Sequence, residues 1–244
     1  MANLKNILLV FILLTVFSSA RGQEEEKDYN QQAWIDLNPR WVMKSGKTML
    51  RGSLGYRTIF PQEWDRYVIN LGLSHSPFIH QAERNVAIQY MRFHAGIGDY
   101  FTQSLDGLNL NEIRLSQGVH LRWPSFPRVF LTHYFRIEER FEHIQHSDDY
   151  DFTMRFRYRL GARFRFLKPF LSDLYLPVSA EVFMSTGQGF YFNDVIRVTP
   201  GIGYDFTDQF STEFQLSYHF SRNSSTESFE NNDLVYRLRV YFTF

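Results

Sequence analysis

Apolar and polar residues alternate along most of this chain, and the clearest example is DFTMRFRYRLGARFRF, Asp151–Phe166. From Phe152 onward every second residue is apolar. The intervening positions hold five arginines: Arg155, Arg157, Arg159, Arg163 and Arg165. Because successive side chains of a strand point to opposite faces, this pattern predicts a strand with one largely aromatic face and one arginine face.

The same two-residue period recurs along the chain. Further segments that carry it are Ala33–Met43, Leu50–Phe60, Tyr67–Leu73, Ile113–Trp123, Val129–Ile137, Leu174–Val182, Ile196–Phe206, Phe214–Phe220 and Leu234–Phe244. Two-faced segments of about ten residues match tilted strands that cross a membrane. The pattern therefore predicts an all-β chain that forms an antiparallel transmembrane β-barrel.

A soluble β-sandwich is the alternative, with the apolar faces turned to a shared core. Its strands would usually be shorter, and so many arginines would have no role in it. The chain has 25 Phe and 14 Tyr, more aromatic residues than an ordinary soluble core holds. The mean hydropathy is nevertheless −0.32, because the apolar residues are interleaved with polar ones. This combination favours the barrel.

The number of strands follows less directly from the pattern. An irregular segment at Val86–Ala95 brings the segments to about eleven, whereas bacterial single-chain barrels normally have an even number of strands. We therefore expect 12 strands, with 10 as the alternative. Short turns are predicted at Lys44–Lys47, Pro124–Pro127, Lys168–Asp173 and Thr207–Gln209. Longer loops are predicted at Ser76–Arg84, Gly96–Leu108, His143–Tyr150 and Arg222–Asn232.

The N-terminus has the features of an export signal. Lys5 precedes an apolar stretch from Ile7 to Phe17, which is too short to span a bilayer as a helix, and small residues follow it. We expect residues 1–22 to be a signal peptide cleaved after Gly22, although an uncleaved anchor is the alternative. A short acidic segment, 23–30, then leads into a barrel over 31–244. The chain contains no Cys, so no disulfide holds it together.

Several stretches together give a more specific identification. These are AWIDLNPRW, NEIRLSQGVHLRW, FRIEERFEH, FRYRLGARFRF, AEVFM and the terminal YRLRVYFTF. With the signal sequence, they resemble the DUF2490 family of bacterial outer-membrane proteins across essentially the whole mature chain. The resemblance implies a barrel in the outer membrane of a diderm bacterium and implies no known activity. The terminal Phe244 also resembles the signal that barrel-assembly machinery recognises during insertion.

The arginine face predicts the chemistry of the barrel interior. If the aromatic faces contact lipid, about 16 Lys or Arg side chains point inward against about 6 Asp or Glu, although the chain has 26 of each charge overall. The candidate lumen-lining residues are Arg114, Arg136, Arg155, Arg157, Arg159, Arg163, Arg165, Arg237, Arg239, Glu112, Glu138 and Glu181.

Two functions fit such a lumen. Rings of arginine lower the electrostatic cost for anions, which would make the chain an anion-preferring small-solute porin. Alternatively the arginines pair with the glutamates and fill a narrow barrel. Strand number does not decide between them, because barrels of about eight strands are filled and those of 16 to 18 are open. We therefore expect a barrel of unknown physiological role, structural or narrowly conducting, without assigning a solute or an oligomeric state.

Gln117 and His133 break the apolar pattern at positions that should face lipid. If the hairpin turns symmetrically about Pro124–Pro127, these residues lie side by side across the ladder, where they can bond to each other. A lipid-active enzyme with its His on the outer wall is a further alternative, but it needs a nucleophile beside the base. Their outward neighbours supply none, so we expect no enzyme.

Other chemistry is weakly represented in the sequence. The loop residues His143, His146, Asp148 and Asp149 are better explained as a solvated loop than as metal ligands. The tryptophans fall near strand ends, where interfacial anchors are expected: Trp34, Trp41, Trp64 and Trp123. We expect no metal, no cofactor and no nucleic-acid partner, and outer-membrane lipid as the surroundings.

Overall fold

The computed structural model describes residues 30–61, 63–77, 90–105, 107, 109–122, 129–145, 150–165, 173–186, 190–222 and 229–244, with side chains described except at 190–194, 222 and 229–232. The predicted signal peptide, its cleavage position and residues 23–29 lie outside the described residues. So do the predicted turn at 124–127, Trp123, all but the last residue of the predicted turn at 168–173, and parts of the loops at 76–84, 143–150 and 222–232.

The described residues form eleven strands and are entirely β in their regular structure. The strands are β1 (Asn30–Val42), β2 (Thr48–Phe60), β3 (Trp64–His75), β4 (Tyr90–Ser104), β5 (Leu110–Arg122), β6 (Val129–Ile144), β7 (Tyr150–Arg165), β8 (Leu174–Thr186), β9 (Phe190–Asp205), β10 (Phe210–Arg222) and β11 (Phe229–Thr243). Within the described part of the chain, no helix is long and apolar enough to cross a membrane.

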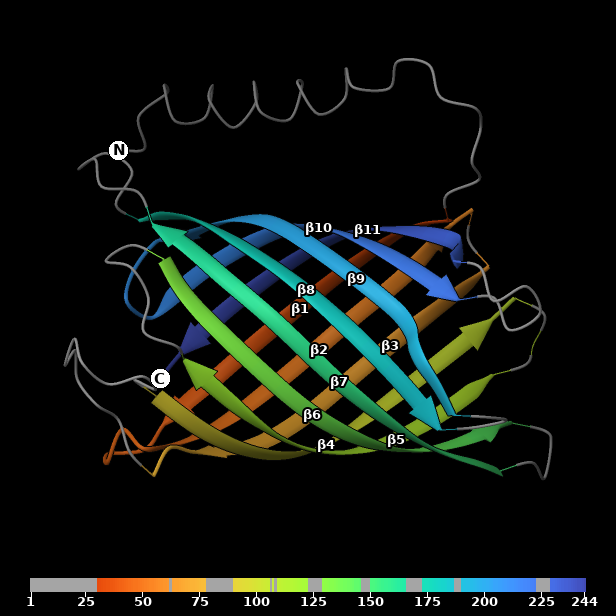
Figure 1. Ribbon diagram of the computed structural model, residues 1–244, viewed down its shortest axis with the longest axis horizontal. Helices are drawn as coiled ribbons and strands as arrows, with labels where there is room; N and C mark the ends of the chain where they lie inside the picture. The colour runs from red at the N-terminus through yellow and green to blue at the C-terminus, as the bar shows by residue number, and fades with distance from the viewer. Residues whose placement is uncertain are drawn as a thin grey trace, which may run out of the picture.

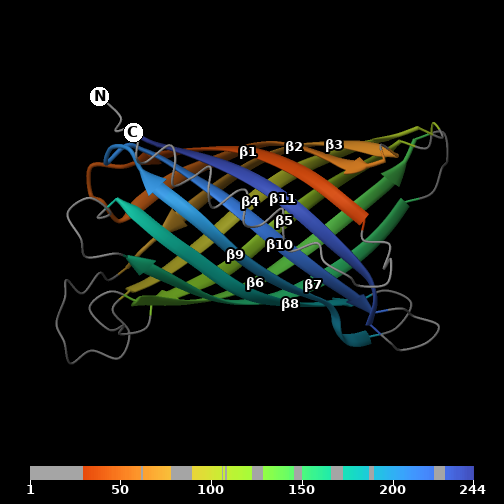
Figure 2. The ribbon, with the colours of Figure 1, turned by 90° about the horizontal axis from the view of Figure 1, so that it is seen from above.

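The strands close into a barrel in which each strand pairs with its neighbour in sequence, and β1 pairs with β11. Figure 1 shows the strands crossing the long axis obliquely, and Figure 2 shows the same wall from above. Closure leaves no strand with an unpaired edge. The predicted antiparallel barrel architecture is confirmed for all pairs except the closing one.

The predicted strand number is wrong, because the described residues form neither 12 nor 10 strands but eleven. Each hairpin reverses the chain direction, so the first and last of an odd number of strands run the same way. β1 and β11 accordingly pair in parallel, from Asn30 opposite Asp233 to Arg40 opposite Thr243. The number of alternating segments in the sequence matches the number of strands, whereas the rule that barrels have an even number of strands does not apply here.

The predicted loop at Gly96–Leu108 is also wrong, since β4 continues through it to Ser104. Its glycines weaken the strand signal but suit a crowded interior. A Cβ on Gly98 would lie 2.0 Å from Asn70 Oδ1, and one on Gly96 would lie 2.7 Å from the Leu71 carbonyl oxygen. The absence of a side chain lets neighbouring strands and side chains approach closely at these points.

The β3–β4 connection departs from the predicted alternation of short turns and long loops. Ser76 donates its backbone N–H to the Lys47 carbonyl at 2.8 Å, so this connection begins beside the short β1–β2 turn. The longer connection and the short turn therefore lie at the same end of the barrel.

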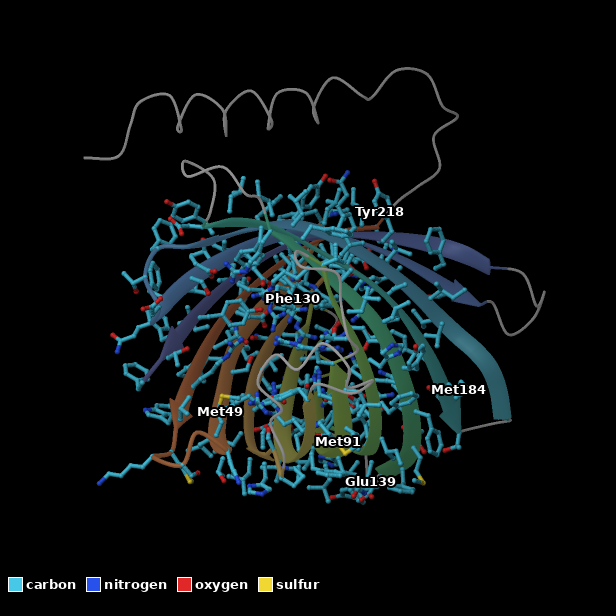
Figure 3. The ribbon with its side chains drawn as sticks, turned by 60° about the vertical axis from the view of Figure 1, so that its left-hand side comes forward. Met49, Met91, Phe130, Glu139, Met184 and Tyr218 are labelled. Carbon is cyan, nitrogen blue, oxygen red and sulfur yellow. The ribbon has the colours of Figure 1, made fainter. Side chains whose placement is uncertain are left out.

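The two faces of each strand differ as the alternation predicts. Large apolar side chains cover the outer wall, including Leu54 at 50 % exposure and Ile69 at 54 %. Polar side chains on the opposite face are buried inside, among them Asp36 at 1 % and Glu138 at 0 %. Figure 3 shows Tyr218 and Glu139 on opposite sides of the barrel, both on its outer surface, while nitrogen-bearing side chains gather in the interior. The barrel is thus apolar outside and polar inside.

Candidate functional site

A cavity of about 460 Å³ lies in the barrel lumen, and every strand contributes to its lining. Its walls carry twelve arginines but only one carboxylate, Asp36. The arginines are Arg40, Arg51, Arg57, Arg66, Arg114, Arg136, Arg155, Arg157, Arg159, Arg197, Arg237 and Arg239. Three histidines, His94, His120 and His219, also line it. The described lining is therefore strongly cationic.

The candidate lining residues from the sequence divide into three groups in the structure. Seven line the cavity directly: Arg114, Arg136, Arg155, Arg157, Arg159, Arg237 and Arg239. The acids Glu112, Glu138 and Glu181 are buried at the barrel wall, between the arginines that they bind. Arg163 and Arg165 reach other strands across the lumen.

Glu138 is the most deeply buried acid of this network. Its side chain is 0 % exposed and lies 3.0 Å from Arg136 Nε and 2.5 Å from Arg157 Nη1. Arg157 also donates to Glu181 at 2.9 Å, so one guanidinium bridges two carboxylates on β6 and β8. A buried carboxylate is tolerated only where such partners replace water.

Glu112 is a second buried carboxylate that binds two arginines. It accepts from Arg114 at 2.5 and 2.7 Å and from Arg140 at 2.5 Å. Arg140 also forms an ion pair with Glu142. Two-pronged contacts of this kind suit the fork shape of a guanidinium and fix its direction.

Other contacts cross the lumen between strands that are not neighbours. Arg163 on β7 lies 3.2 Å from Glu213 on β10, and Arg165 lies 2.8 Å from Asp205 on β9. Tyr175 on β8 donates its hydroxyl to the same Glu213 at 3.0 Å, and Tyr241 on the neighbouring β11 donates to it at 3.1 Å. The arginine contacts thus join strands that are two or three places apart in the wall.

Several inward arginines form no ion pair with a carboxylate among the described residues. They are Arg40, Arg51, Arg57, Arg66, Arg92, Arg122, Arg155, Arg159 and Arg239. Some contact aromatic rings instead: the Arg57 guanidinium lies 4.2 Å from the Trp34 ring centroid, and that of Arg159 lies 5.1 Å from Tyr134. All of them except Arg92 and Arg122 line the cavity, and these unpaired guanidinium groups give it an excess of positive charge.

The tryptophans do not all lie where the sequence suggests. Trp41 is exposed on the outer wall and stacks on Phe244, with ring centroids 5.7 Å apart. Trp34, in contrast, points inward at 8 % exposure, and Trp64 also lines the cavity. Trp34 occupies the polar phase of β1, so the alternation itself contained the signal for its inward position.

The predicted pairing of Gln117 with His133 is wrong. The β5–β6 register opposes Gln117 to Ile137 and His133 to Leu121. The hairpin is therefore centred differently from the symmetric turn assumed about Pro124–Pro127. His133 lies 2.8 Å from the Tyr158 hydroxyl through Nδ1, and Gln117 Nε2 donates to Glu139 at 3.5 Å.

Two acidic residues on the outer face were not predicted from the sequence. Asp99 lies on the outer face of β4 between Ile69 and Ile113, and Glu139 lies on the outer face of β6. Glu139 accepts a hydrogen bond from Gln117, whereas Asp99 lies between two apolar residues of the neighbouring strands. Asp99 was missed because β4 was partly assigned to a loop, and Glu139 because Glu138 beside it fitted the inward phase.

In the part of the chain that the structure describes, no group of three or more His, Cys, Asp or Glu side chains is placed to hold a metal ion. His143 stacks on Tyr150 with ring centroids 4.5 Å apart. His146, Asp148 and Asp149, considered above as loop ligands, lie outside the described residues.

Comparison with known proteins gives a family but no activity. The family described as "Protein of unknown function (DUF2490)" matches residues 29–231, which include β1 to β10 and the start of β11. No curated protein and no solved structure matches the chain. The match covers most of the sequence and agrees with the resemblance seen in its strand motifs, so the chain belongs to the DUF2490 family.

Proposed function

We propose that this protein is a β-barrel of a bacterial outer membrane whose arginine-lined lumen admits small anions, and that it is not an enzyme. The observation that carries the proposal is the cavity, in which twelve arginines face a single carboxylate. The physiological role is passage or retention of small anionic solutes in a narrow lumen.

The outer wall supports the membrane part of the proposal. Strands of 12 to 16 residues, tilted in the wall, are long enough to cross a bilayer. Leu54, Ile69 and Leu71 are about half exposed in the middle of their strands, an arrangement that is costly in water but favourable in lipid. Closure of the barrel also satisfies the backbone hydrogen bonds that hydrocarbon cannot.

The balance of charge in the lumen supports the anion preference. Guanidinium groups from many strands line the cavity and repel cations that enter it. The guanidinium groups that are paired with buried glutamates are held in fixed positions. A cluster of one sign inside low-dielectric walls focuses the potential and raises the local concentration of counter-ions. The arginine–carboxylate contacts that cross the lumen make any passage narrow.

Single-channel recording in a planar bilayer tests the proposal. Protein expressed from the full-length sequence and purified from membranes is added to the bilayer, and a salt gradient gives the ratio of anion to cation permeability. We expect small, stable, anion-selective steps. Arg51→Gln with Arg159→Gln removes two cavity charges that have no carboxylate partner among the described residues, and should lower the anion preference severalfold.

The matched control is Lys44→Gln with Lys47→Gln, which removes two charges from the exposed β1–β2 turn. This variant should keep the selectivity of the parent. Cation selectivity, or equal effects of the two double variants, would contradict the proposal. Absence of conductance from protein whose electrophoretic mobility still changes on heating, and which is therefore folded, would indicate a purely structural barrel.

A further inference from the structure

Five cavity side chains form a compact group around one tryptophan ring. The Trp34 cluster consists of Trp34 on β1, Arg57 on β2, Arg197 on β9, His219 on β10 and Arg237 on β11. The Cζ atoms of the three arginines lie 4.2, 5.7 and 5.3 Å from the Trp34 ring centroid. His219 meets the same ring edge-on at 5.7 Å. All five residues line the cavity.

The carboxylates near this cluster neutralise only part of its charge. Arg237 Nε lies 2.5 Å from Asp36, and Arg197 Nη1 lies 3.5 Å from Glu181. Glu181 is shared, because Arg157 binds it at 2.9 Å. Arg57 forms no ion pair with a carboxylate among the described residues. The cluster therefore keeps a positive excess after its acids are counted.

Buried hydrogen-bonding atoms in the cluster also lack partners within the described chain. They are Arg57 Nε, Arg197 Nε and His219 Nε2. His219 is 6 % exposed, so its unbonded nitrogen is deeply buried. An unsatisfied buried donor is destabilising, and more so when it is charged. Three such atoms beside one cavity point to a bound anion as their partner.

We propose that the Trp34 cluster is a phosphate-binding site that takes inorganic phosphate or the phosphate group of a small organic molecule. This inference rests on the proposed function in one respect, that anions enter the lumen. Arg57, Arg197 and His219 project from three different strands around the barrel wall. A tetrahedral oxyanion accepts hydrogen bonds from several directions, whereas a planar carboxylate accepts mainly in its own plane.

The size of the cavity allows more than a phosphate group. At about 460 Å³ it falls within the range of about 300 to 1,000 Å³ typical of small-molecule sites. The aromatic and polar walls around the cluster, including Tyr100 and Tyr134, can accommodate a short organic substituent. Inorganic phosphate and a phosphate monoester are thus two sources of the same recognised group.

Isothermal titration calorimetry of the detergent-solubilised full-length product tests the site, with inorganic phosphate, glycerol phosphate and succinate as probes in chloride buffer. We expect either phosphate compound, or both, to bind, and succinate to bind at least about tenfold more weakly. Binding of only one phosphate compound would identify the source. Arg57→Gln and His219→Gln should each weaken phosphate binding about tenfold, the loss expected for one hydrogen bond to a charged ligand.

Arg122→Gln is the matched control, because Arg122 is an arginine at the strand end that does not line the cavity. Its phosphate affinity should stay within about twofold of the parent, a change worth less than about half a kcal/mol. Equal weakening by Arg122→Gln, or succinate binding as tightly as phosphate, would overturn the site. Heat-modifiable mobility of each variant on gels establishes that the barrel is folded.

The outcomes separate this site from the proposed channel. Calorimetry needs no conduction, so phosphate binding by an electrically silent barrel would support the site while contradicting the channel. Anion-selective conductance without phosphate binding by the parent protein would overturn the site and leave the channel intact.

Discussion

Glu138 and Glu139 are neighbours in the sequence but occupy opposite environments. Glu138 is fully buried between Arg136 and Arg157, whereas Glu139 lies on the outer face of the same strand, beside Gln117. At the scale of a residue, the two-residue period of a strand therefore decides whether an acid points inward and binds arginines or lies on the outer surface.

We predict that Glu138→Gln lowers the free energy of unfolding by about 3 kcal/mol, because two buried guanidinium groups lose their shared counter-charge. Glu139→Gln is the matched control and should change stability by less than about 0.5 kcal/mol, as is usual for a surface position outside the buried ion-pair network. Urea unfolding in lipid vesicles, followed by tryptophan fluorescence, measures both. Equal losses in the two variants would show that the burial of Glu138 has no energetic consequence.

At the scale of an element, the pair of strands that closes the barrel, β1 and β11, differs from all the other pairs because it is parallel. β1 and β11 pair in parallel over eleven positions, and two backbone bonds extend the seam: Val42 N–H to the Phe244 carbonyl at 2.9 Å, and Phe244 N–H to the Arg40 carbonyl at 2.8 Å. Parallel pairing here is a consequence of the odd strand count. The C-terminal residue thereby fixes the end of the seam.

The parallel register predicts a specific disulfide. Leu37 and Val240 are partners in it, and neighbouring strands lie about 4.8 Å apart, within the range of about 4.4 to 6.8 Å between the Cα atoms of a disulfide. The double variant Leu37→Cys with Val240→Cys should form an intramolecular bond on mild oxidation, seen as a thiol-dependent mobility shift. The natural chain has no Cys that could interfere.

Leu37→Cys with Leu234→Cys is the control, since Leu234 is paired with Gln31 and lies six residues away along the strand from Val240. It should remain reduced under the same conditions. A bond in the control but not in the test pair, or in neither, would contradict the eleven-strand closure.

At the scale of the whole molecule, the barrel turns an almost neutral chain into two contrasting surfaces. The sequence has 26 basic and 26 acidic residues, yet the cavity lining holds twelve arginines and one carboxylate. Large apolar side chains cover the outside. This separation of charge from apolar surface is the property on which both the proposed membrane location and the proposed anion preference depend.

Adjacent residues on β2 test that separation. Leu54 is 50 % exposed on the outer wall, and Ser53 lines the cavity. If the wall faces lipid, Leu54→Arg should make folding into lipid vesicles less favourable by about 2 to 4 kcal/mol, the cost of an arginine near the membrane midplane. Ser53→Arg adds the same group on the opposite face and should cost less. Equal costs, or tolerance of Leu54→Arg, would argue against a lipid-facing wall.

The sequence by itself determined most of the strand segments and which face of each of them is polar. It did so because the pleat has a period of two, so that alternation in the chain becomes alternation in space. The arginine stretch from Arg155 to Arg165 and the acids Glu112, Glu138 and Glu181 could therefore be assigned to one face from local alternation alone. Asp36 and Arg57 lay in the same polar phase.

Only the tertiary structure decided how those faces meet. The parallel seam, the extension of β4 through Gly96 and the β5–β6 register all depend on pairing between strands, which local alternation does not encode. Closure then brings Trp34 against Arg197 and His219, which are far apart in the sequence. Which arginines bind a carboxylate and which stay uncompensated follows from those distances across the lumen, because an ion pair needs contact and not merely a shared face.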